Sequence, residues 1–481
     1  MSTYMLPVST PASQGVAADG ILSFLDALEA LPEADPHSLM ILRHGQVIAS
    51  GWWWPYTPER RHLLYSLSKS FTSTAALLAI ADGLLQLDDP VIAHFPELDA
   101  EITLARARSM LVRHVAAMAS GHLGETWEQV LSSDPDEPIR GFLQLPPERE
   151  PGTVFAYNQS ATYTLAAIVQ RRTGQTLVEY LRQRLGEALG AGEVSWRQHP
   201  VGRDIGFSGL FATTDTVARL GQLYLQRGKW RGNQLLAEDL VADATRPHIS
   251  TRSRLNGAGE PEPDWQEGYG FQFWMSRHGY RGDGAYGQFC VVLPEYDAVV
   301  AMTAQTDDMQ AVLDVMWDKL LPAFDATDRD ADAGTVLERR LEHLAVRSFE
   351  GRFAPFNDDE VWTRGTFLPI RGACEQQESL LAVKLAREED GWRVTFSEAD
   401  WTMNAGFRND KWVVTEPVSR CDGVPTACVG GWLDGSTLRL DVVFLETPHR
   451  LVVTCRLPER TFGARWKSVP LHTLSLRDLR A

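Results

Sequence analysis

The sequence YSLSKS, residues 65–70, stands directly before a long apolar run that extends to residue 85. The run contains several alanines and predicts a buried helix that opens just after Tyr65. Ser66 and Lys69 are three residues apart, so on this helix they would lie on one face, one turn apart. The pair is therefore the first candidate for chemistry in the chain.

A hydroxyl and an amine held together at a helix N-terminus can act as a nucleophile and its base. Ser66 could attack a substrate, and Lys69 could accept its proton if burial lowers the pKa of the amine. The helix dipole would favour the anion that forms. The alternative is structural, because Ser-x-x-Lys is frequent by chance and Ser66 could simply be the N-cap of a core helix.

Length and charge limit the classes of protein to consider. The chain has 481 residues, of which 44% are hydrophobic, and a net charge of −17. This length predicts two domains with sizeable cores and no long disordered span. The negative charge argues against nucleic acid as a partner, because phosphate binding requires a basic surface.

Cysteine spacing, metal motifs and targeting segments bear on the cellular compartment and on bound metals or cofactors. Five scattered cysteines predict free thiols in a reducing compartment rather than a disulfide scaffold or a zinc knuckle. Residues 1–20 show no secretory signal and no segment is apolar enough to span a bilayer, so we expect a cytoplasmic protein without a membrane partner. No His-Glu-x-x-His pair and no glycine-rich phosphate loop is present, so we expect neither a metal nor a cofactor.

The order of predicted elements indicates an α/β (α+β) domain whose sheet comes from both ends of one segment. Residues 18–31 have helical spacing, and β-rich runs over 39–50 indicate a hairpin. A largely helical block follows, with a loop expected over 134–152. Strands and a last helix are then expected at residues 270–275, 287–293, 298–303 and 310–321. The prediction is an antiparallel sheet flanked by helices, with an inserted helical subdomain.

The remainder of the chain has a different character. We assign residues 1–325 to the first domain and residues 326–335, acidic and rich in small residues, to a linker. Residues 336–481 are expected to form an accessory all-β domain, an antiparallel sandwich or small barrel, with turns such as Asp434-Gly435 between its strands. This second domain shows no catalytic cluster.

Tyr157 is the second candidate for chemistry, in the sequence PGTVFAYNQS of residues 151–160. A tyrosine on a loop that leads into a helix can project into a cleft. A phenol whose pKa is lowered beside a cation can exchange a proton with a serine or a leaving group. Simple packing at the helix entry is an equally good explanation of this stretch alone.

The third candidate is the sequence GDGAYGQ, residues 282–288, before an apolar strand. Its glycines allow close approach by another chain or a ligand, and a strand edge beside a nucleophile could supply one N–H to an oxyanion hole. An ordinary glycine turn is the alternative. A Gly-x-Ser-x-Gly nucleophile elbow is nearly present at residues 206–210, but its last glycine is missing.

Taken together, the three candidates resemble the serine hydrolases of the β-lactamase and penicillin-binding-protein superfamily. The similarity is to the class C-like branch of esterases, DD-peptidases and D-amino-acid peptidases, and it extends over residues 15 to 325. The stretches GLLQLDDPV, PGT and GLFATTD, at residues 83–91, 151–153 and 209–215, are also similar to this branch. The resemblance implies a β-lactamase-like fold for the first domain.

The resemblance also implies roles for individual residues. Ser66 would be the acylated nucleophile, Lys69 would help to deprotonate it, and Tyr157 would relay the proton to the leaving group. Backbone N–H groups of Ser66 and Gln288 would form the oxyanion hole.

Departures from the family pattern bear on the substrate. The family's Tyr-x-Asn reads Tyr157-Asn158-Gln159, and its Lys-Thr-Gly or His-x-Gly reads Ala-Tyr-Gly at residues 285–287. The cation that would meet a substrate carboxylate is therefore missing, which disfavours β-lactams and peptides ending in D-alanine. The expected substrate-binding residues are Asn158, Gln159, Tyr286 and Gly287.

The favoured hypothesis is a metal-free serine hydrolase that forms an acyl-enzyme on a small ester or amide, as in the esterase-type and nylon-oligomer-hydrolase-type members. A β-lactamase, D-alanyl-D-alanine peptidase or D-aminopeptidase activity is the first alternative. A non-catalytic binding protein with the same fold is the second. The sequence leaves the oligomeric state open.

Overall fold

The structure is a computed structural model of the chain. It describes residues 5–252, 254, 259–326, 332–349, 351–352, 355, 359–370, 372–374, 376–419, 423–471 and 475–480, without the side chain at position 187. None of the described helices is both long enough and apolar enough to cross a membrane.

One six-stranded antiparallel sheet organises the first part of the chain, and its strands come from both ends of that part, as the sequence predicts. The strand order is β2-β1-β11-β10-β9-β8. The strands are β1 (Ala34–Arg43), β2 (Gln46–Trp52), β8 (Trp274–Met275), β9 (Tyr280–Gly284), β10 (Gln288–Leu293) and β11 (Ala298–Thr306). The central strands β10 and β11 are buried along their whole length, which fits their Val- and Ala-rich sequence.

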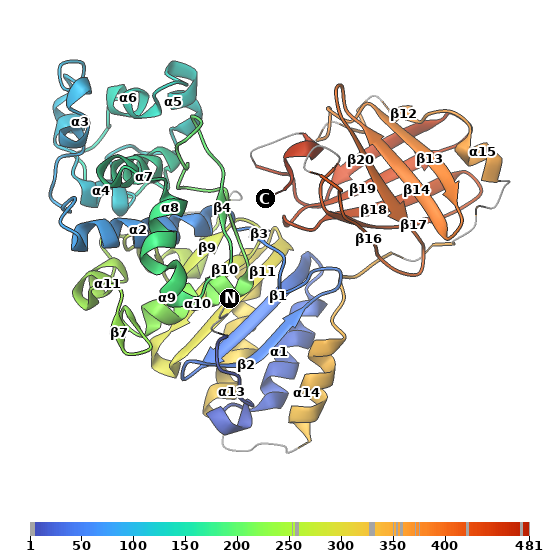
Figure 1. Ribbon diagram of the computed structural model, residues 1–481, viewed down its shortest axis with the longest axis horizontal. Coiled ribbons are helices and arrows are strands. Elements are labelled where there is room, and N and C mark those ends of the chain that lie inside the picture. Colours follow the sequence, from blue (N-terminus) through green and yellow to red (C-terminus); the bar gives the residue numbers. More distant parts are fainter. Residues whose placement is uncertain are drawn as a thin grey trace.

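Terminal helices pack beside this sheet (Figure 1). They are α1 (Ala18–Ala30), α12 (Met309–Val315), α13 (Leu321–Asp325) and α14 (Ala333–Glu342). Helix α14 begins at Ala333, inside the predicted linker of residues 326–335, and packs against α1 and β2. Residues 327–331 of that linker lie outside the described residues, and the domain limits at 325 and 336 stay a prediction.

A helical block lies between β2 and β8 in sequence and stands above the sheet in Figure 1. Its helices are α2 (Ser68–Ala81), α3 (Ala105–Arg108), α4 (Val112–Ala116), α5 (Trp127–Ser133), α6 (Pro138–Gln144), α7 (Gln159–Thr173), α8 (Leu177–Leu181), α9 (Glu187–Leu189), α10 (Thr214–Leu225) and α11 (Glu238–Ala244). Short strands within it are β3 (His62–Leu63), β4 (Ser195–Trp196), β5 (Leu210–Ala212), β6 (Lys229–Trp230) and β7 (Asn233–Gln234).

Helix α2 is the buried centre of the first domain. Its residues from Ser68 to Ala79 are all buried. Small side chains allow this close packing, and its hydroxyls find acceptors on other segments: Ser70 donates to the Gln272 carbonyl and Thr72 to the Gly206 carbonyl. Because each of these buried hydroxyls is paired, the helix tolerates burial on every side.

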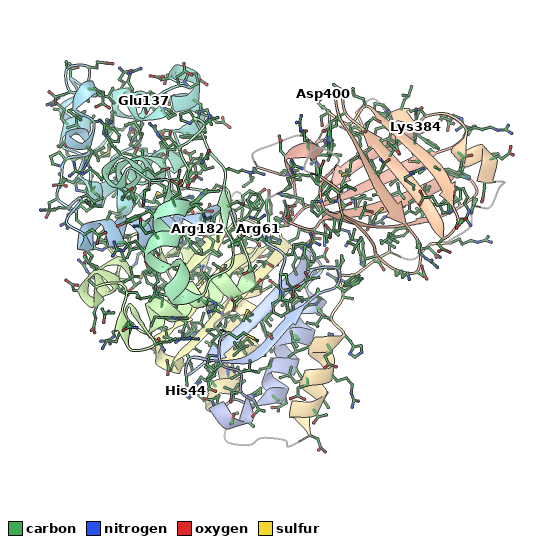
Figure 2. The ribbon with its side chains drawn as sticks, viewed as in Figure 1. His44, Arg61, Glu137, Arg182, Lys384 and Asp400 are labelled. Carbon is green, nitrogen blue, oxygen red and sulfur yellow. The ribbon has the colours of Figure 1, made fainter. Side chains whose placement is uncertain are left out.

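The end of the chain forms two further sheets, which confirms the predicted β character of this region. One sheet has the order β12-β20-β19-β18-β17-β16 and the other β13-β14-β15. The strands are β12 (Leu368–Pro369), β13 (Ala382–Glu388), β14 (Gly391–Ser397), β15 (Thr402–Phe407), β16 (Val413–Thr415), β17 (Thr426–Trp432), β18 (Thr437–Phe444), β19 (Arg450–Arg456) and β20 (Thr461–Trp466), and helix α15 (Asp359–Thr363) precedes them. Figure 2 places Lys384 and Asp400 on this C-terminal unit and Glu137 on the helical block.

Several expected elements differ in the structure. The expected loop over 134–152 contains helix α6, and the expected strand over 270–275 is reduced to its last two residues. Strand β9 lies where the glycines at 282 and 284 indicated a turn. In the C-terminal part, strand β17 is buried at every position and contains Gly430 and Gly431, so its sequence lacks the alternation that indicates a strand.

The glycines of β9 are needed for packing. A Cβ atom on Gly284 would overlap the Leu64 carbonyl oxygen, and one on Gly282 would overlap the Ser70 hydroxyl. The backbone of β9 therefore lies directly against the segment that carries Ser66 and leads into α2. This contact brings the third sequence candidate beside the first.

We expect Gly284→Ala to lower the free energy of unfolding by about 1–3 kcal/mol, the usual range for an overpacked core. The matched control is Gly124→Ala, because a Cβ atom there meets nothing within 4 Å. Thermal unfolding of both variants measures the difference. A Gly284→Ala protein as stable as the control would contradict the close packing of β9.

Candidate active site

Ser66 lies in a 3-10 turn, Tyr65–Leu67, that runs directly into helix α2. The helix begins at Ser68, two residues later than expected, and Leu67 occupies the N-cap position without a side-chain capping bond. The capping role considered for Ser66 is therefore wrong. The side chain of Ser66 is instead partly exposed and directed toward the amine of Lys69, with 3.0 Å between Oγ and Nζ.

Lys69 is only 1% exposed, and its amine has three oxygen neighbours. Besides Ser66 Oγ, Nζ lies 2.6 Å from Gln159 Oε1 and 2.8 Å from the Phe207 carbonyl oxygen. Both carbonyl oxygens can only accept hydrogen bonds, so they take two N–H groups. The third position faces a hydroxyl, which can accept from an ammonium or donate to the lone pair of a neutral amine.

Burial lowers the pKa of Lys69 from 10.5 to about 7, although Glu125 and Asp283 act in the opposite direction. An amine with this pKa is neutral in a large fraction of molecules at neutral pH. Its two remaining N–H groups then match the two carbonyl acceptors, and its lone pair faces the Ser66 O–H. The arrangement can accept the serine proton without any rearrangement of the lysine.

Tyr157 lies on the other side of the lysine. Nζ of Lys69 is 4.6 Å from the centroid of its ring, and the ring stacks on Trp274 at 5.4 Å. Burial and the charge of Asp283 raise the pKa of Tyr157, while a hydrogen bond with Ser66 acts to lower it. The expectation of a lowered phenol pKa is wrong, because burial outweighs the lowering effects of the Ser66 hydrogen bond and the Arg254 charge. A neutral Tyr157 can donate a proton but is a poor base.

The two residues after Tyr157 have different positions. Gln159 is partly exposed and contacts Lys69 through its side-chain oxygen. Asn158 is fully buried, and its Oδ1 accepts from Ser160 N and from Thr126 Oγ1, each at 3.0 Å. The side chain predicted to contact substrate at position 158 thus caps helix α7 and shapes the loop that presents Tyr157.

The third candidate, the stretch of residues 282–288, lies beside the serine turn. Ala285 and Tyr286 pack with Leu63, Tyr65 and Phe211 beside the serine turn. Gly287 lies in the turn toward β10 with φ of 90°, where a side chain would be strained. Gln288 is fully buried, and its side chain donates to the carbonyls of Ala285 and Ala304. Its role as an oxyanion donor concerns only its backbone N–H and stays a prediction.

Sequence reasoning did not identify three groups near the pair. The Phe207 carbonyl belongs to the stretch 206–210 that failed as a nucleophile elbow, and a backbone oxygen leaves no residue-type signal. Asp283 is 7% exposed and pairs with Arg281 at 3.0 Å. Glu125 accepts from the N–H of Gln159 at the start of α7. Among the described residues there is no cluster of His, Cys, Asp and Glu that could hold a metal ion.

A family model described as Beta-lactamase matches residues 27–322, more than half of the chain. The chain belongs to the beta-lactamase family. This membership makes the protein a serine hydrolase, and it confirms the resemblance found in the sequence and the predicted fold of the first domain.

Individual relatives are distant. The 6-aminohexanoate-dimer hydrolase of Paenarthrobacter ureafaciens is 25% identical over 319 residues, which cover 62% of this chain and 80% of that protein. The lovastatin esterase of Penicillium rubens is 26% identical over 163 residues, 29% of this chain and 40% of the esterase. The D-aminopeptidase of Gluconobacter oxydans is 27% identical over 34% of this chain and 33% of its own length.

Two solved structures share the fold. EstCE1, described as a hydrolase with promiscuous acyltransferase activity, superposes with a TM-score of 0.51 at 18% identity and covers 64% of this chain and all of its own. A penicillin-binding protein homologue from Caulobacter crescentus gives a TM-score of 0.50 at 16% identity, over 63% of this chain and 99% of its own. At these identities the two structures bear on the fold alone.

The protonation of Lys69 gives a testable pH dependence. Only the neutral amine can accept the serine proton, so we expect kcat/KM to rise about tenfold per pH unit below pH 7 and to level off above it. We expect Lys69→Ala to reduce turnover at least ~100-fold, as for the loss of a general base. Initial rates across pH on an activated ester measure both effects.

Lys384→Ala is the matched control, since Lys384 is exposed on the C-terminal unit (Figure 2). It should leave the rate and its pH profile unchanged. Near wild-type turnover of Lys69→Ala would show that the proton takes another route.

Proposed function

We propose that the protein hydrolyses a small ester or amide through a covalent acyl-enzyme on Ser66. The observation that carries the proposal is the position of the Lys69 amine, held by two carbonyl oxygens with its third neighbour the Ser66 hydroxyl. Such an amine serves as a resident base for the serine. A core helix without a catalytic role has no need for a buried, unprotonated lysine.

Acylation follows from this geometry. Ser66 Oγ attacks the substrate carbonyl carbon while its proton moves to the lone pair of Lys69, and the carbonyl oxygen becomes an oxyanion. The backbone N–H groups of Ser66 and Gln288 are the proposed donors to that oxyanion. Tyr157 gives its proton to the departing alkoxide or amine and regains one from Lys69, so the leaving group departs neutral.

Deacylation reverses the direction of proton flow. Water attacks the acyl carbon and gives one proton to Tyr157, which at the same time passes its own phenol proton to the neutral amine of Lys69. Collapse of the second tetrahedral intermediate returns the proton to Ser66 Oγ and releases the acid. The raised pKa of Tyr157 suits a group that carries a proton between atoms without remaining ionised.

The site also supports a substrate class. In the third motif, Ala285 stands at the position where the family's Lys or His would meet a substrate carboxylate. Beside the serine turn, the partly exposed aromatic rings of Tyr157 and Tyr286 supply apolar walls. Such walls favour an uncharged acyl or alkyl group over a carboxylate. Two of the distant relatives, a 6-aminohexanoate-dimer hydrolase and a lovastatin esterase, are likewise named for substrates other than β-lactams.

Labelling of the serine tests the proposal directly. We expect a fluorophosphonate to add one adduct to the protein, located by peptide mass spectrometry on Ser66. Ser66→Ala should lose both the adduct and the hydrolysis of short-chain nitrophenyl esters. Ser132→Ala, which changes an exposed serine on α5, should retain both.

The alternatives predict different results in the same assays. A Ser66→Ala protein with wild-type ester turnover would contradict the proposal. Rapid turnover of nitrocefin would favour a β-lactamase activity, and release of D-alanine or of an N-terminal D-amino acid would favour a peptidase. Absence of any adduct or turnover in the wild-type protein would favour a binding protein.

A further inference from the structure

Two tyrosines beside the serine have an unusual backbone conformation. Tyr65, directly before Ser66, has φ of 46°, and Tyr286, two residues before Gln288, has φ of 69°. Bulky residues rarely adopt this left-handed region, and the strain persists only where the surroundings enforce it. The two rings contact each other edge to face, with centroids 5.5 Å apart.

The hydroxyls of both tyrosines are held by the C-terminal unit. Tyr65 Oη lies 2.6 Å from Nε2 of His449, and Tyr286 Oη donates to the Val469 carbonyl at 2.5 Å. The Leu471 N–H lies 3.4 Å from Tyr65 Oη. His449 immediately precedes β19, whereas Val469 and Leu471 follow β20. Segments about 400 residues from the serine in sequence thus contact its immediate neighbour.

The direction of the hydrogen bond between Tyr65 and His449 follows from the partner of the second ring nitrogen of His449, Nδ1. Nδ1 of His449 lies 3.0 Å from the Ser468 carbonyl oxygen, which can only accept. Nδ1 therefore carries the hydrogen, and in the neutral ring Nε2 accepts from the Tyr65 O–H. His449 is fully buried, and its ring also packs edge-on against both tyrosines, with centroids 5.8 and 5.4 Å away.

The same C-terminal turn holds the approach to the serine. The Leu63 N–H donates to the Glu446 carbonyl at 2.8 Å, so β3 is tied to the turn that leads to His449. This contact fixes Leu63, two residues before Tyr65, against the C-terminal unit before the chain turns into α2.

Backbone geometry links these contacts to catalysis. The peptide plane between Tyr65 and Ser66 is oriented by the backbone torsions of Tyr65, so the direction of the Ser66 N–H depends on the left-handed Tyr65. On the other side, Tyr286 begins the turn that leads to the Gln288 N–H. These are the two donors proposed for the oxyanion hole, and donors of this kind act only when they are already oriented.

We propose that the C-terminal β unit is a working part of the active site, in which His449 and the Val469 carbonyl clamp Tyr65 and Tyr286 and thereby orient the oxyanion hole. We call this set of four residues the tyrosine clamp. His449 is a positioning residue, because it acts through Tyr65 and not on the substrate. The inference rests on the proposed acyl-enzyme at Ser66 and assigns a role to the second domain, in which the sequence showed no catalytic cluster.

The clamp should act on the transition state more than on the bound substrate, because the oxyanion exists only after attack. We therefore expect Tyr65→Phe and His449→Phe each to lower kcat by about 10- to 100-fold with KM changed less than about threefold, below the effect of losing a whole oxyanion donor. The affinity of a boronic acid that forms a tetrahedral adduct with Ser66 should fall by a similar factor.

A double-mutant cycle separates the clamp from general packing. Because both variants remove the same hydrogen bond, the Tyr65→Phe/His449→Phe double variant should be no more impaired than either single variant. His449→Gln keeps an acceptor near the Nε2 position, so its kcat should lie between those of His449→Phe and the wild-type protein. The matched control is Tyr56→Phe, which removes another buried hydroxyl facing the same turn and should leave kcat and boronate affinity unchanged.

The outcomes distinguish the clamp from the proposed function. Wild-type kcat and boronate affinity in Tyr65→Phe would overturn the clamp, even if His449→Phe does not fold. Losses that add in the double variant, or an equal loss in Tyr56→Phe, would also overturn it, since they would report on domain packing alone. If the wild-type protein forms no boronate adduct at Ser66, the acyl-enzyme proposal has failed instead.

Discussion

The contact of the Lys69 amine with the Phe207 and Gln159 oxygens is the interaction on which the rest of the site depends. It joins three segments of the first domain: the N-terminal turns of α2, the loop before β5 and the start of α7. Burial of the amine lowers its pKa to about 7 from the ordinary 10.5. Between these two pH values the unfolded chain binds more protons than the folded one, so the Lys69 contribution to stability rises with pH across that window. The protein thus keeps an unfavourable buried amine where an unprotonated base is useful.

A second constraint is the closeness of two backbones. Strand β9 can approach the serine turn only because Gly282 and Gly284 lack side chains that would overlap the Ser70 hydroxyl and the Leu64 carbonyl oxygen. The turn after β9 then brings Tyr286 against Tyr65, and the C-terminal unit holds both hydroxyls. The serine therefore lies at a junction of helical block, sheet and C-terminal unit. At this junction the second domain contacts the residues next to the serine, which explains how it can affect the active site of the first domain.

The sequence predicted what depends on local periodicity and on residue type. The helix after residue 66, the hairpin, the last strands and the β character of the C-terminal part are of this kind, and so is the pair Ser66 and Lys69. Contacts that involve backbone atoms left no signal, as for the Phe207 carbonyl. The glycines at 282 and 284 indicate a turn by residue type, since strand propensity does not register the close packing of β9. The pKa of Tyr157 was predicted in the wrong direction, since its burial depends on the whole fold. The contact of His449 with Tyr65 joins residues that no local pattern relates.

The state of the Lys69 amine is the central claim, and its titration is the most direct test. Nitrogen-15 NMR of protein labelled at lysine side chains would follow each amine across pH, with the Lys69 signal assigned by its absence from Lys69→Met. We expect the Lys69 amine to titrate near pH 7, well below the ordinary lysine pKa of 10.5. A Lys69 signal that titrates together with the exposed lysines would contradict the account, because the amine would then be an ammonium when it faces Ser66.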